Sequence, residues 1–351
     1  MTENQMNKER FRFCIVGTGS IAGLQIKAIG EMESVEVVGL CSSSEDRARA
    51  AEEKFGIKTY YDVEELLDQE NPDGVILSTA SGNHLNPCLL AAERGIHVLS
   101  EKPLEVTVER AEKMIDACRK HQVNLGCIFQ SRFNPEFQKL KKAVDDGKLG
   151  DLLLGNAYIK WYRPSEYYSS SPWRGTLDGD GGAALINQGI HTIDLLQYVM
   201  GPVKSVYGHV QTRVHDIEGE DVGTAMIRFE NGSQGVIEGG TALYPGYPER
   251  LEIFGSRGSI VMEGGHIIEW NLMEEEKTEQ SSGFSPGSGA SDPLAIDFSL
   301  HQNQIRDFVE SVREGKDPAV TGEEGLKALA LIRAIYESSE KGEKIALGRK
   351  L

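Results

Sequence analysis

The chain has 351 residues, a formal net charge of −17 and five cysteines. That length exceeds what one hydrophobic core usually supports, so two domains are expected. The acidic balance argues against nucleic acid or an anionic membrane as a partner, because both need a positively charged surface. The N-terminus shows no signal-peptide core and no apolar run approaches membrane-spanning length, which predicts a cytoplasmic protein.

The five cysteines form no CxxC pair, and their number is odd. Most of them lie in apolar runs, so buried and reduced thiols are expected. The sequence also contains no cluster of His, Cys and carboxylate residues with metal-ligand spacing. We therefore expect neither disulfides nor a metal site.

Residues 1–128 alternate short apolar strands with helices. Strands are expected at FRFCIVG, VEVVGLC, GVILST, HVLS and VNLGCIF, with helices near residues 21–30, 45–55, 83–94 and 107–121. Short β-branched runs between helices indicate a parallel sheet that is covered on both faces. This first part is therefore predicted to be a doubly wound Rossmann domain.

Residues 129–351 are predicted to form a second α/β domain with a large open, mainly antiparallel sheet. Its strands are expected at DLLLGNAYIKWYR, VKSVYGHVQTRV, GTAMIRFE, SQGVIEGG, RLEIFGS and GSIVMEGG, with Asn231–Gly232 as a hairpin turn. A helix over 182–200 is expected to pack on this sheet, and further helices follow near 297–314 and 322–340. The polar stretch 274–296 is expected to be a mobile loop.

A glycine-rich turn follows the first expected strand. The residues Gly17-Thr18-Gly19-Ser20-Ile21-Ala22 fit the pattern GxGxxA. The first glycine permits the tight turn, the second lets a pyrophosphate approach the backbone, and the small last residue lets the helix pack on the strand. The helix N-terminus then offers free N–H groups to the phosphates. Because this turn opens a βαβ unit, it predicts a dinucleotide-binding site rather than an ordinary turn.

The choice between NAD and NADP stays open. An Asp or Glu usually ends the second strand and binds the ribose 2′-OH of NAD. This strand ends instead in Cys41, followed by Ser42 and Ser43. Serine hydroxyls together with Arg47 suit a 2′-phosphate, which favours NADP. The alternative is that Ser42 serves NAD and that Arg47 is a solvated helix residue.

A lysine stands where open α/β sheets bind ligands. The tripeptide Glu101-Lys102-Pro103 follows the strand HVLS, beyond the carboxyl end of the sheet. A lysine there can donate to a substrate hydroxyl, and its pKa falls if it is desolvated. On the tripeptide alone, a surface lysine in a turn is the favoured interpretation.

Residues 181–201, GGAALINQGIHTIDLLQYVMG, predict a helix that avoids solvent. Between Gly175 and Val203 there is no Lys, Arg or Glu, although a helix with a solvated face normally carries them. An apolar and a polar stripe recur at helical spacing: Ile186, Ile190, Ile193 and Leu196 form the first, and Asn187, His191 and Asp194 form the second. The polar stripe must face something other than water.

Five motifs occur in a characteristic order: GTGSIA, the strand-end EKP, FQSRFNP, GGAALINQGIHTIDLL and HQNQIRDFVESVREGKDP. Together they resemble the glucose-fructose oxidoreductase / inositol dehydrogenase / MocA family over residues 11–347. The resemblance implies a Rossmann domain followed by an α/β domain whose open sheet assembles a homodimer or homotetramer. It also implies NAD(P)-dependent oxidation or reduction of a sugar or cyclitol carbon, and a polar stripe that faces the cofactor cleft.

The resemblance assigns catalytic roles to Lys102, the lysine of the EKP motif, and to His191, the histidine of a GxHxxD motif. His191 would remove the hydroxyl proton while Lys102 stabilises charge on the same oxygen, or the two roles are exchanged. Inositol-dehydrogenase-like members carry an aspartate where this chain has Asn187. An amide can orient a hydroxyl but cannot take a proton, so that aspartate's role does not transfer. Asp194 either fixes the imidazole or serves the fold.

Further candidates come from the loops. For the cofactor they are Thr79, Asn83, His84, Glu101 and Gln130, although Asn83 would equally cap the following helix. For the substrate they are Arg163, Trp173 and Arg174 in WYRPSEYYSSSPWRG, since aromatics and arginines suit a sugar ring and an acidic group. Loop packing is the alternative for these three.

The sequence thus predicts an oxidoreductase that acts on a sugar, with C3 of a nucleotide-linked or glycosidic hexose as the proposed position. Asn187 favours a nucleotide-linked sugar, because members acting on such amino sugars also show Asn there. Three alternatives are an inositol dehydrogenase, a glycosidase working by NAD-dependent oxidation and elimination, and a non-catalytic nucleotide-binding sensor.

Overall fold

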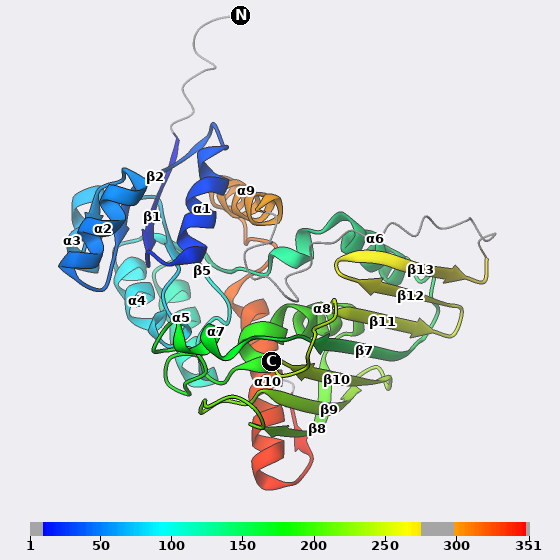
Figure 1. Cartoon of the computed structure of the whole chain (residues 1–351). Helices are drawn as coiled ribbons and strands as arrows, with labels where there is room; N and C mark the ends of the chain where they lie inside the picture. The colour runs from blue at the N-terminus through cyan, green and yellow to red at the C-terminus, as the bar shows by residue number, and fades with distance from the viewer. Residues whose placement is uncertain (1–9, 275–297, 349–351) are drawn as a thin grey trace, which may run out of the picture. The chain divides into compact units, whose positions relative to one another are not determined.

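Figure 1 shows the computed structural model of the chain, which describes residues 10–274 and 298–348. The chain divides into two compact units. The first comprises Met1–Glu105, Glu109–Ile128 and Phe298–Gly325, and the second comprises Val106–Val108, Phe129–Asp297 and Leu326–Leu351. One division between the units falls between Ile128 and Phe129. They are discontinuous, however, because a late segment belongs to the first unit.

The first unit is a parallel sheet with the strand order β3-β2-β1-β4-β5-β6, the doubly wound order expected for a Rossmann domain. Its strands are β1 Phe11–Val16, β2 Val35–Cys41, β3 Thr59–Tyr60, β4 Gly74–Leu77, β5 His97–Ser100 and β6 Leu125–Cys127. Its helices are α1 Ser20–Gly30, α2 Glu45–Phe55, α3 Val63–Glu70, α4 Leu85–Glu93, α5 Val108–Lys120 and α9 Ser299–Glu314. The predicted Rossmann fold is confirmed.

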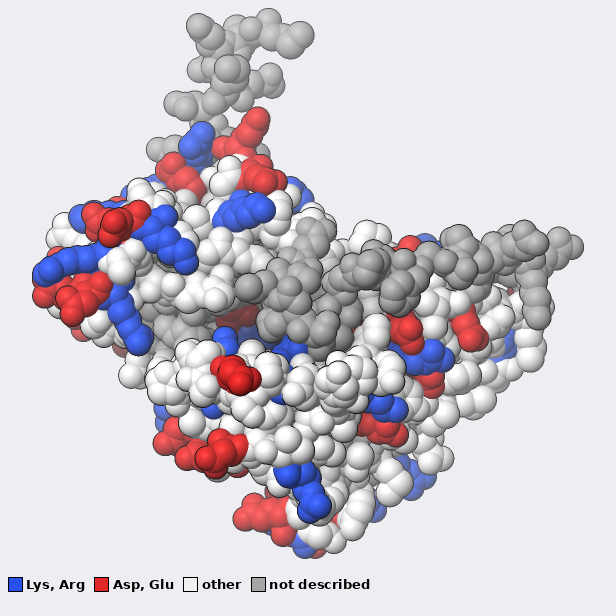
Figure 2. All heavy atoms as spheres, in the orientation of Figure 1, with Lys and Arg blue, Asp and Glu red and all other residues white. Residues whose placement is uncertain are grey.

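Charged side chains gather over two helices of the first unit. Over α2 and α3, Lys and Arg lie among Asp and Glu on the face drawn in Figure 2. Arg94 donates at 2.7 Å to Asp68 of α3 and also pairs with Glu64. Such exposed ion pairs each contribute less than about 1 kcal/mol to stability.

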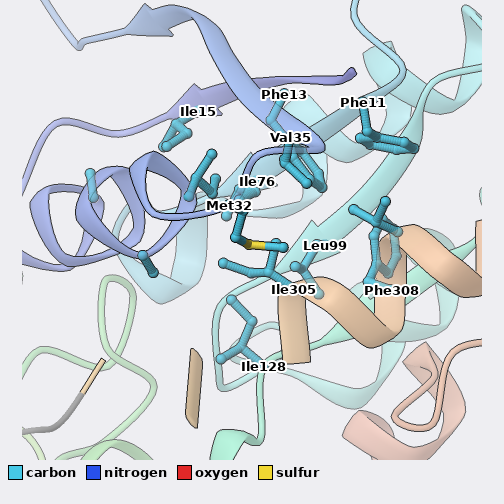
Figure 3. Packing of buried hydrophobic residues seen from close by; sticks show 14 of the residues in the cluster. Phe11, Phe13, Ile15, Met32, Val35, Ile76, Leu99, Ile128, Ile305 and Phe308 are labelled. Atoms are coloured by element: carbon cyan, nitrogen blue, oxygen red, sulfur yellow. The ribbon is translucent and has the colours of Figure 1, made fainter. Parts of the chain in front are cut away.

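The late helix α9 completes the core of the Rossmann sheet. Side chains on one face of β1, among them Phe13 and Ile15, pack against α1, and Ile305 and Phe308 of α9 join the same cluster (Figure 3). The ring centroids of Phe13 and Phe308 are 6.2 Å apart. A sheet covered by helices explains the apolar strands found in the sequence. The core therefore needs a segment about 290 residues downstream of β1.

The second unit is a sheet in the order β13-β12-β11-β7-β10-β9-β8-β14. Its strands are β7 Leu152–Lys160, β8 Val203–Gln211, β9 Val222–Phe229, β10 Gln234–Gly240, β11 Arg250–Gly255, β12 Gly258–Glu263, β13 His266–Leu272 and β14 Ile345–Ala346. All neighbouring strands are antiparallel except β7 and β10, which are parallel. The predicted open, mainly antiparallel sheet is confirmed. Asn231–Gly232 lies in the turn between β9 and β10, with Gly232 at φ +90°.

The helices of the second unit are α6 Pro135–Asp145, α7 Ser165–Ser169, α8 Ile190–Met200 and the greater part of α10 Gly322–Lys341. Helix α8 packs on the sheet, as predicted, at strand positions without side chains. A Cβ on Gly155 of β7 would lie 2.7 Å from Met200 of α8, and one on Gly239 of β10 would lie 2.4 Å from Leu185, just before α8. The predicted helix is nevertheless not uniform, because Ala184–Gly189 forms a π-helical turn before α8.

All five cysteines are buried and free of disulfides, as predicted. No helix in residues 10–274 and 298–348 is long and apolar enough to cross a membrane. The polar stretch predicted to be a mobile loop lies, apart from its first residue, outside the described residues.

Candidate active site

The predicted dinucleotide turn joins β1 to α1 with no room for side chains at its first glycine. Gly17 has φ +112°, and a Cβ there would lie 2.4 Å from the carbonyl oxygen of Ser78. Gly19 is the N-cap of α1, and a Cβ on it would meet nothing within 4 Å. No side chain caps this helix. A helix N-terminus with open space before it, and no side chain bonded to it, is the arrangement that receives phosphate groups.

The end of β2 lies against this turn. The amide of Gly17 donates to the carbonyl of Cys41, and the hydroxyls of Thr18 and Ser42 are 2.9 Å apart. Arg47 is exposed and donates to the Ser43 hydroxyl at 3.2 Å. The structure thus brings Thr18 and Ser42 together beside the dinucleotide turn. It holds Arg47 beside Ser43 at the rim.

The residue before Lys102 holds a buried hydrogen-bond network. The Glu101 carboxylate accepts from the Gln25 amide at 2.8 Å and from the backbone N–H of Lys102 at 3.2 Å. Gln25, in turn, accepts from the Ser78 hydroxyl at 2.5 Å. Burial raises the pKa of Glu101 to about 7, although the Lys102 charge opposes this shift. Glu101 therefore positions the backbone of Lys102, while Lys102 itself is only half-buried.

The loop after β4 is held by His84. The two ring nitrogens of His84 lie 3.2 Å from the carbonyl of Leu104 and 3.4 Å from that of Thr79. Burial lowers the pKa of His84. The imidazole thus links the Thr79 loop to the segment after Lys102, which is a positioning role. The alternative that Asn83 caps the next helix is wrong, because His84 is the N-cap of α4 and makes no side-chain cap bond.

In the second unit, the π-helical turn Ala184–Gly189 is anchored by a buried carboxylate. Glu220 accepts from the N–H groups of Ala183 at 3.0 Å and Leu185 at 2.6 Å, and from the Tyr336 hydroxyl of α10 at 2.8 Å. Burial raises the pKa of Glu220. A carboxylate at a helix N-terminus satisfies N–H groups that have no partner within the helix. π-helical turns are rare and often occur at functional sites, and this one contains Asn187.

Two members of the polar stripe face polar side chains of their own unit. The Asp194 carboxylate accepts from Arg132 at 2.6 and 2.8 Å in a bidentate, buried ion pair. Asn187 is buried and donates to the Asp180 carboxylate. His191 is half-buried in the first turn of α8, with its ring 5.8 Å from that of Phe129 in an edge-on contact. The pair with Arg132 supports a role in the fold for Asp194.

The two arginines of the predicted substrate loop differ. Arg163 is 2% exposed and donates to the Gln188 side chain at 2.8 and 3.2 Å, which favours the packing alternative. Arg174 is half-buried and donates to the Tyr167 carbonyl at 3.0 Å. Its Nε has no hydrogen-bond partner within the described part of the chain. Trp173 is half-buried next to it, and the guanidinium lies 5.8 Å from the indole ring.

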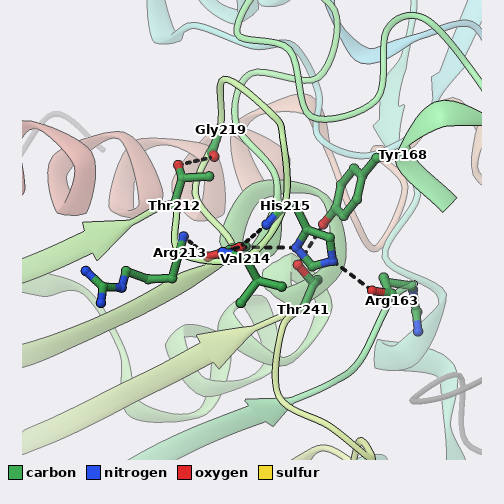
Figure 4. Close-up of polar contacts among 9 residues, drawn as sticks. Arg163, Tyr168, Thr212, Arg213, Val214, His215, Gly219 and Thr241 are labelled. Atoms are coloured by element: carbon green, nitrogen blue, oxygen red, sulfur yellow. Dashed lines mark hydrogen bonds and ion pairs between the residues drawn. The ribbon is translucent and has the colours of Figure 1, made fainter. Parts of the chain in front are cut away.

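The backbone of the substrate loop is held by a second buried cluster (Figure 4). The Asp221 carboxylate accepts from the N–H groups of Arg213, Val214 and His215 at 2.8–2.9 Å. The His215 ring lies 3.1 Å from Asp221 through Nδ1 and 2.8 Å from the Arg163 carbonyl through Nε2. The backbone of this loop is therefore held at Arg163 by residues between β8 and β9.

The predicted site residues fall into both units. The Gly17–Ile21 turn, Ser42, Ser43, Arg47, the Thr79–His84 loop, Glu101 and Lys102 belong to the first unit, and Gln130, Arg163, Trp173, Arg174, Asn187 and His191 belong to the second. Sequence reasoning missed the positioning residues Gln25, Asp180, Gln188, His215 and Glu220. The absence of Lys, Arg and Glu from 176–202 hinted at a buried polar network but did not identify its members.

In comparisons with known proteins, separate family models match the N-terminal and the C-terminal part of the chain. The model of an oxidoreductase family with an NAD-binding Rossmann fold matches residues 11–129, and that of the GFO/IDH/MocA C-terminal domain matches residues 137–261. A solved structure, the WlbA dehydrogenase of Bordetella pertussis in complex with NADH and UDP-GlcNAcA, is 32% identical with a TM-score of 0.86. The match covers 97% of this chain and 99% of that chain.

Two curated relatives are similar over nearly their whole length. The myo-inositol 2-dehydrogenase of Thermotoga maritima is 28% identical, and the match covers 96% of this chain and 98% of the relative. The D-glucoside 3-dehydrogenase of Escherichia coli is 26% identical, with 98% and 100% covered. The two relatives are thus named for a cyclitol and for a glucoside.

Proposed function

The chain belongs to the glucose-fructose oxidoreductase / inositol dehydrogenase / MocA family of NAD-binding oxidoreductases, and from this premise we propose that its substrate is a sugar oxidised or reduced at C3 of a nucleotide-linked or glycosidic hexose. The observation that carries the proposal is the likeness, over 97% of the chain, to a dehydrogenase solved with NADH and UDP-GlcNAcA. The relative named as a D-glucoside 3-dehydrogenase supports the same position on the ring.

Catalysis is proposed for Lys102 and His191, acting on one substrate oxygen. His191 takes the hydroxyl proton, near the natural pKa of an imidazole, as the carbon is oxidised. Lys102 donates a hydrogen bond to the same oxygen and stabilises the negative charge that develops there. NAD, when bound, supplies the hydride acceptor. Asn187 orients a hydroxyl, and the Asp180 contact restricts its amide to one orientation.

The cofactor is proposed to lie over the dinucleotide turn, with its pyrophosphate at Gly19 and the α1 N-terminus. Open space at Gly19 and a helix without a side-chain cap support this placement. Ser42, bonded to Thr18, and the exposed Ser43 and Arg47 are proposed at the ribose. No carboxylate ends β2, so we expect NADP to be accepted beside NAD.

The substrate loop is proposed to bind an acidic group through Arg174 rather than Arg163. Arg174 keeps a guanidinium nitrogen without a protein partner in the described residues, whereas Arg163 is engaged by Gln188. Trp173 beside Arg174 offers a flat apolar surface for a sugar ring.

The open sheet is proposed to bind a second copy of the chain. Tyr207 of β8 and Met226 of β9 are direct cross-strand partners, and they are 45% and 62% exposed. Large apolar side chains that share an exposed sheet face are typical of protein interfaces. A homodimer or homotetramer is expected from light scattering after gel filtration.

The experiment mixes the purified protein separately with NAD⁺ and NADP⁺ and follows absorbance of the reduced nicotinamide. The panel contains myo- and scyllo-inositol, free hexoses, glucosides, UDP-N-acetylhexosamines and their uronic acids. Turnover of a nucleotide sugar or glucoside is expected. Lys102→Ala and His191→Ala should each lower it about 10²- to 10⁴-fold while leaving cofactor binding intact.

Each alternative predicts a different result in the same panel. A signal confined to the inositols identifies a cyclitol dehydrogenase. Release of a glycosidic leaving group without net cofactor reduction identifies the oxidation–elimination cycle. Cofactor binding without turnover of any substrate favours the sensor. Unchanged turnover in both alanine variants overturns the assignment of the two catalytic residues.

A further inference from the structure

A directed chain of hydrogen bonds joins the substrate loop to the π-helical turn Ala184–Gly189. Arg163 donates from Nε and Nη2 to Oε1 of Gln188 at 3.2 and 2.8 Å. Nε2 of Gln188 donates at 2.7 Å to Oδ1 of Asn187 and at 2.7 Å to the hydroxyl of Tyr167. Nδ2 of Asn187 donates to the carboxylate of Asp180. All five residues belong to the second unit.

The two ends of this chain fix the direction of every bond in it. A guanidinium only donates, so the oxygen of the Gln188 amide must face Arg163. A carboxylate only accepts when ionised, so the nitrogen of the Asn187 amide must face Asp180. Neither amide can be turned over without placing two donors or two acceptors against each other. The buried charges Arg163 and Asp180 therefore set the orientation of the polar groups between them.

Tyr167 forms a side branch of this chain, and its hydroxyl hydrogen has no acceptor among the described residues. Both hydrogens of the Gln188 amide are committed, one to Asn187 and one to the Tyr167 oxygen. The Tyr167 hydroxyl therefore acts as an acceptor toward Gln188, and its own hydrogen points to no other partner in the described residues. Burial raises the pKa of Tyr167, so the phenol stays protonated.

The position of Tyr167 suits a ligand contact. The residue is half-buried, whereas Arg163, Asp180 and Asn187 are buried. Its ring is held by the guanidinium of Arg174, which lies 4.2 Å from the ring centroid. Through Gln188 its hydroxyl is two hydrogen bonds from Asn187, which stands one helical turn before His191. A donor rigidly aimed from this place can select among substrates.

We propose that Tyr167 is a substrate-binding residue whose hydroxyl donates to an acceptor oxygen of the sugar, and that Gln188 enforces this direction. The inference rests on the proposed function and adds a specificity-determining contact to it. With the positive charge of Arg174 against the phenol ring, the preferred acceptor is an anionic oxygen such as the carboxylate of a uronic acid.

The test measures binding of UDP-GlcNAcA to the full-length, NADH-loaded protein by isothermal titration calorimetry. Tyr167→Phe removes only the hydroxyl and should weaken Kd for this probe about 10- to 100-fold, the range for losing one hydrogen bond to a charged acceptor. Affinity for NADH should not change. The thermal midpoint should fall little, because the Gln188 amide loses its Tyr167 acceptor but still donates to Asn187.

Tyr168→Phe is the matched control. The Tyr168 hydroxyl lies 2.6 Å from that of Thr241 inside the protein, so its loss should lower stability and leave the probe Kd within about twofold. Gln188→Glu is the second variant. A carboxylate there still pairs with Arg163 but accepts from Tyr167, which turns that hydrogen inward, and it also loses the bond that Gln188 donates to Oδ1 of Asn187. It should weaken the probe as Tyr167→Phe does, although the tyrosine is intact.

Wild-type protein that binds and oxidises a sugar, with Tyr167→Phe binding UDP-GlcNAcA equally well, overturns this inference and leaves the proposed function standing. Wild-type protein that binds NADH but none of the panel sugars and no UDP-GlcNAcA overturns the proposed function and this inference together. Weakening by Tyr167→Phe and Gln188→Glu, but not by Tyr168→Phe, supports both.

Discussion

The two units build their candidate sites in different ways. In the first unit the cofactor turn is made of consecutive residues, and its chemistry comes from backbone N–H groups and from space left by Gly17 and Gly19. In the second unit the groups around Asn187 and His191 are held by side chains from separate segments, including Asp180 and Glu220. A backbone site tolerates many changes around its glycines, whereas a buried side-chain network fails when one partner is removed.

The largest effect is expected where the second unit buries an ion pair. Arg132→Ala should lower the free energy of unfolding by about 3–5 kcal/mol, because it leaves the carboxylate of Asp194, 2% exposed, without its bidentate partner. Urea unfolding measures the change. If Asp194 serves only to orient His191, this variant loses turnover and keeps its stability.

A double-mutant cycle separates the pair from its parts. Asp194→Ala should cost a similar amount, and the double variant should cost less than the sum of the two single variants. Replacement of both by apolar residues of similar size, Arg132→Met with Asp194→Leu, should recover much of the loss. Additive costs would show that the two side chains stabilise the fold independently.

The same contrast explains what the sequence predicted. The α2 boundaries, 45–55, and the strand 35–41 match the structure, because apolar periodicity and capping are local properties. The two-residue strand β3 and the short helix α3 were missed, since neither is long enough to show a period. Strands β13 and β14 were missed as well. The return of α9 to the Rossmann core is a tertiary event that no local pattern records.

The site divides in the same manner. The glycine turn, Lys102 and His191 stand in motifs whose spacing is fixed along the chain, so the sequence identified them as candidates. The partner of Asn187 stands seven residues upstream at Asp180, and the support of Arg163 comes from His215. Buried polar residues choose partners by position in space, which requires the fold. Sequence reasoning also gave Arg163 and Arg174 the same role, because the burial and the hydrogen-bond partners that distinguish them require the fold.

Glu101 is an exception in the first unit, because there the site also depends on a buried side chain. Its pKa of about 7 in the folded chain lies above the ordinary value of 4.5. Between these two pH values the folded state holds a proton that the unfolded state has released. The stability that this group contributes is therefore complete below about pH 4.5 and is lost as the pH rises through 7.

Glu101→Gln removes that titration. Raising the pH from 4.5 to 8 should lower the unfolding free energy of the wild type by about 3 kcal/mol more than that of the variant. Urea unfolding at both pH values measures it. Comparing each protein with itself cancels the constant cost of placing an amide beside Gln25 and the Lys102 N–H. Parallel pH profiles for the two proteins would contradict a proton held by Glu101.

The smallest change tests the backbone site directly. Gly17→Ala is unsuitable, because its Cβ would collide with the Ser78 carbonyl and disturb folding. Gly19→Ala adds a methyl group that meets no protein atom within 4 Å, at φ −75°, so the thermal midpoint should not fall. That methyl stands where a pyrophosphate approaches the backbone, so NADH should bind about tenfold more weakly in a fluorescence titration.

Gly30→Ala, at the other end of α1 and equally unobstructed, is the matched control and should leave NADH affinity unchanged. Equal NADH affinity in all three proteins would place the cofactor away from the α1 N-terminus and remove the contrast between a backbone site and a side-chain site.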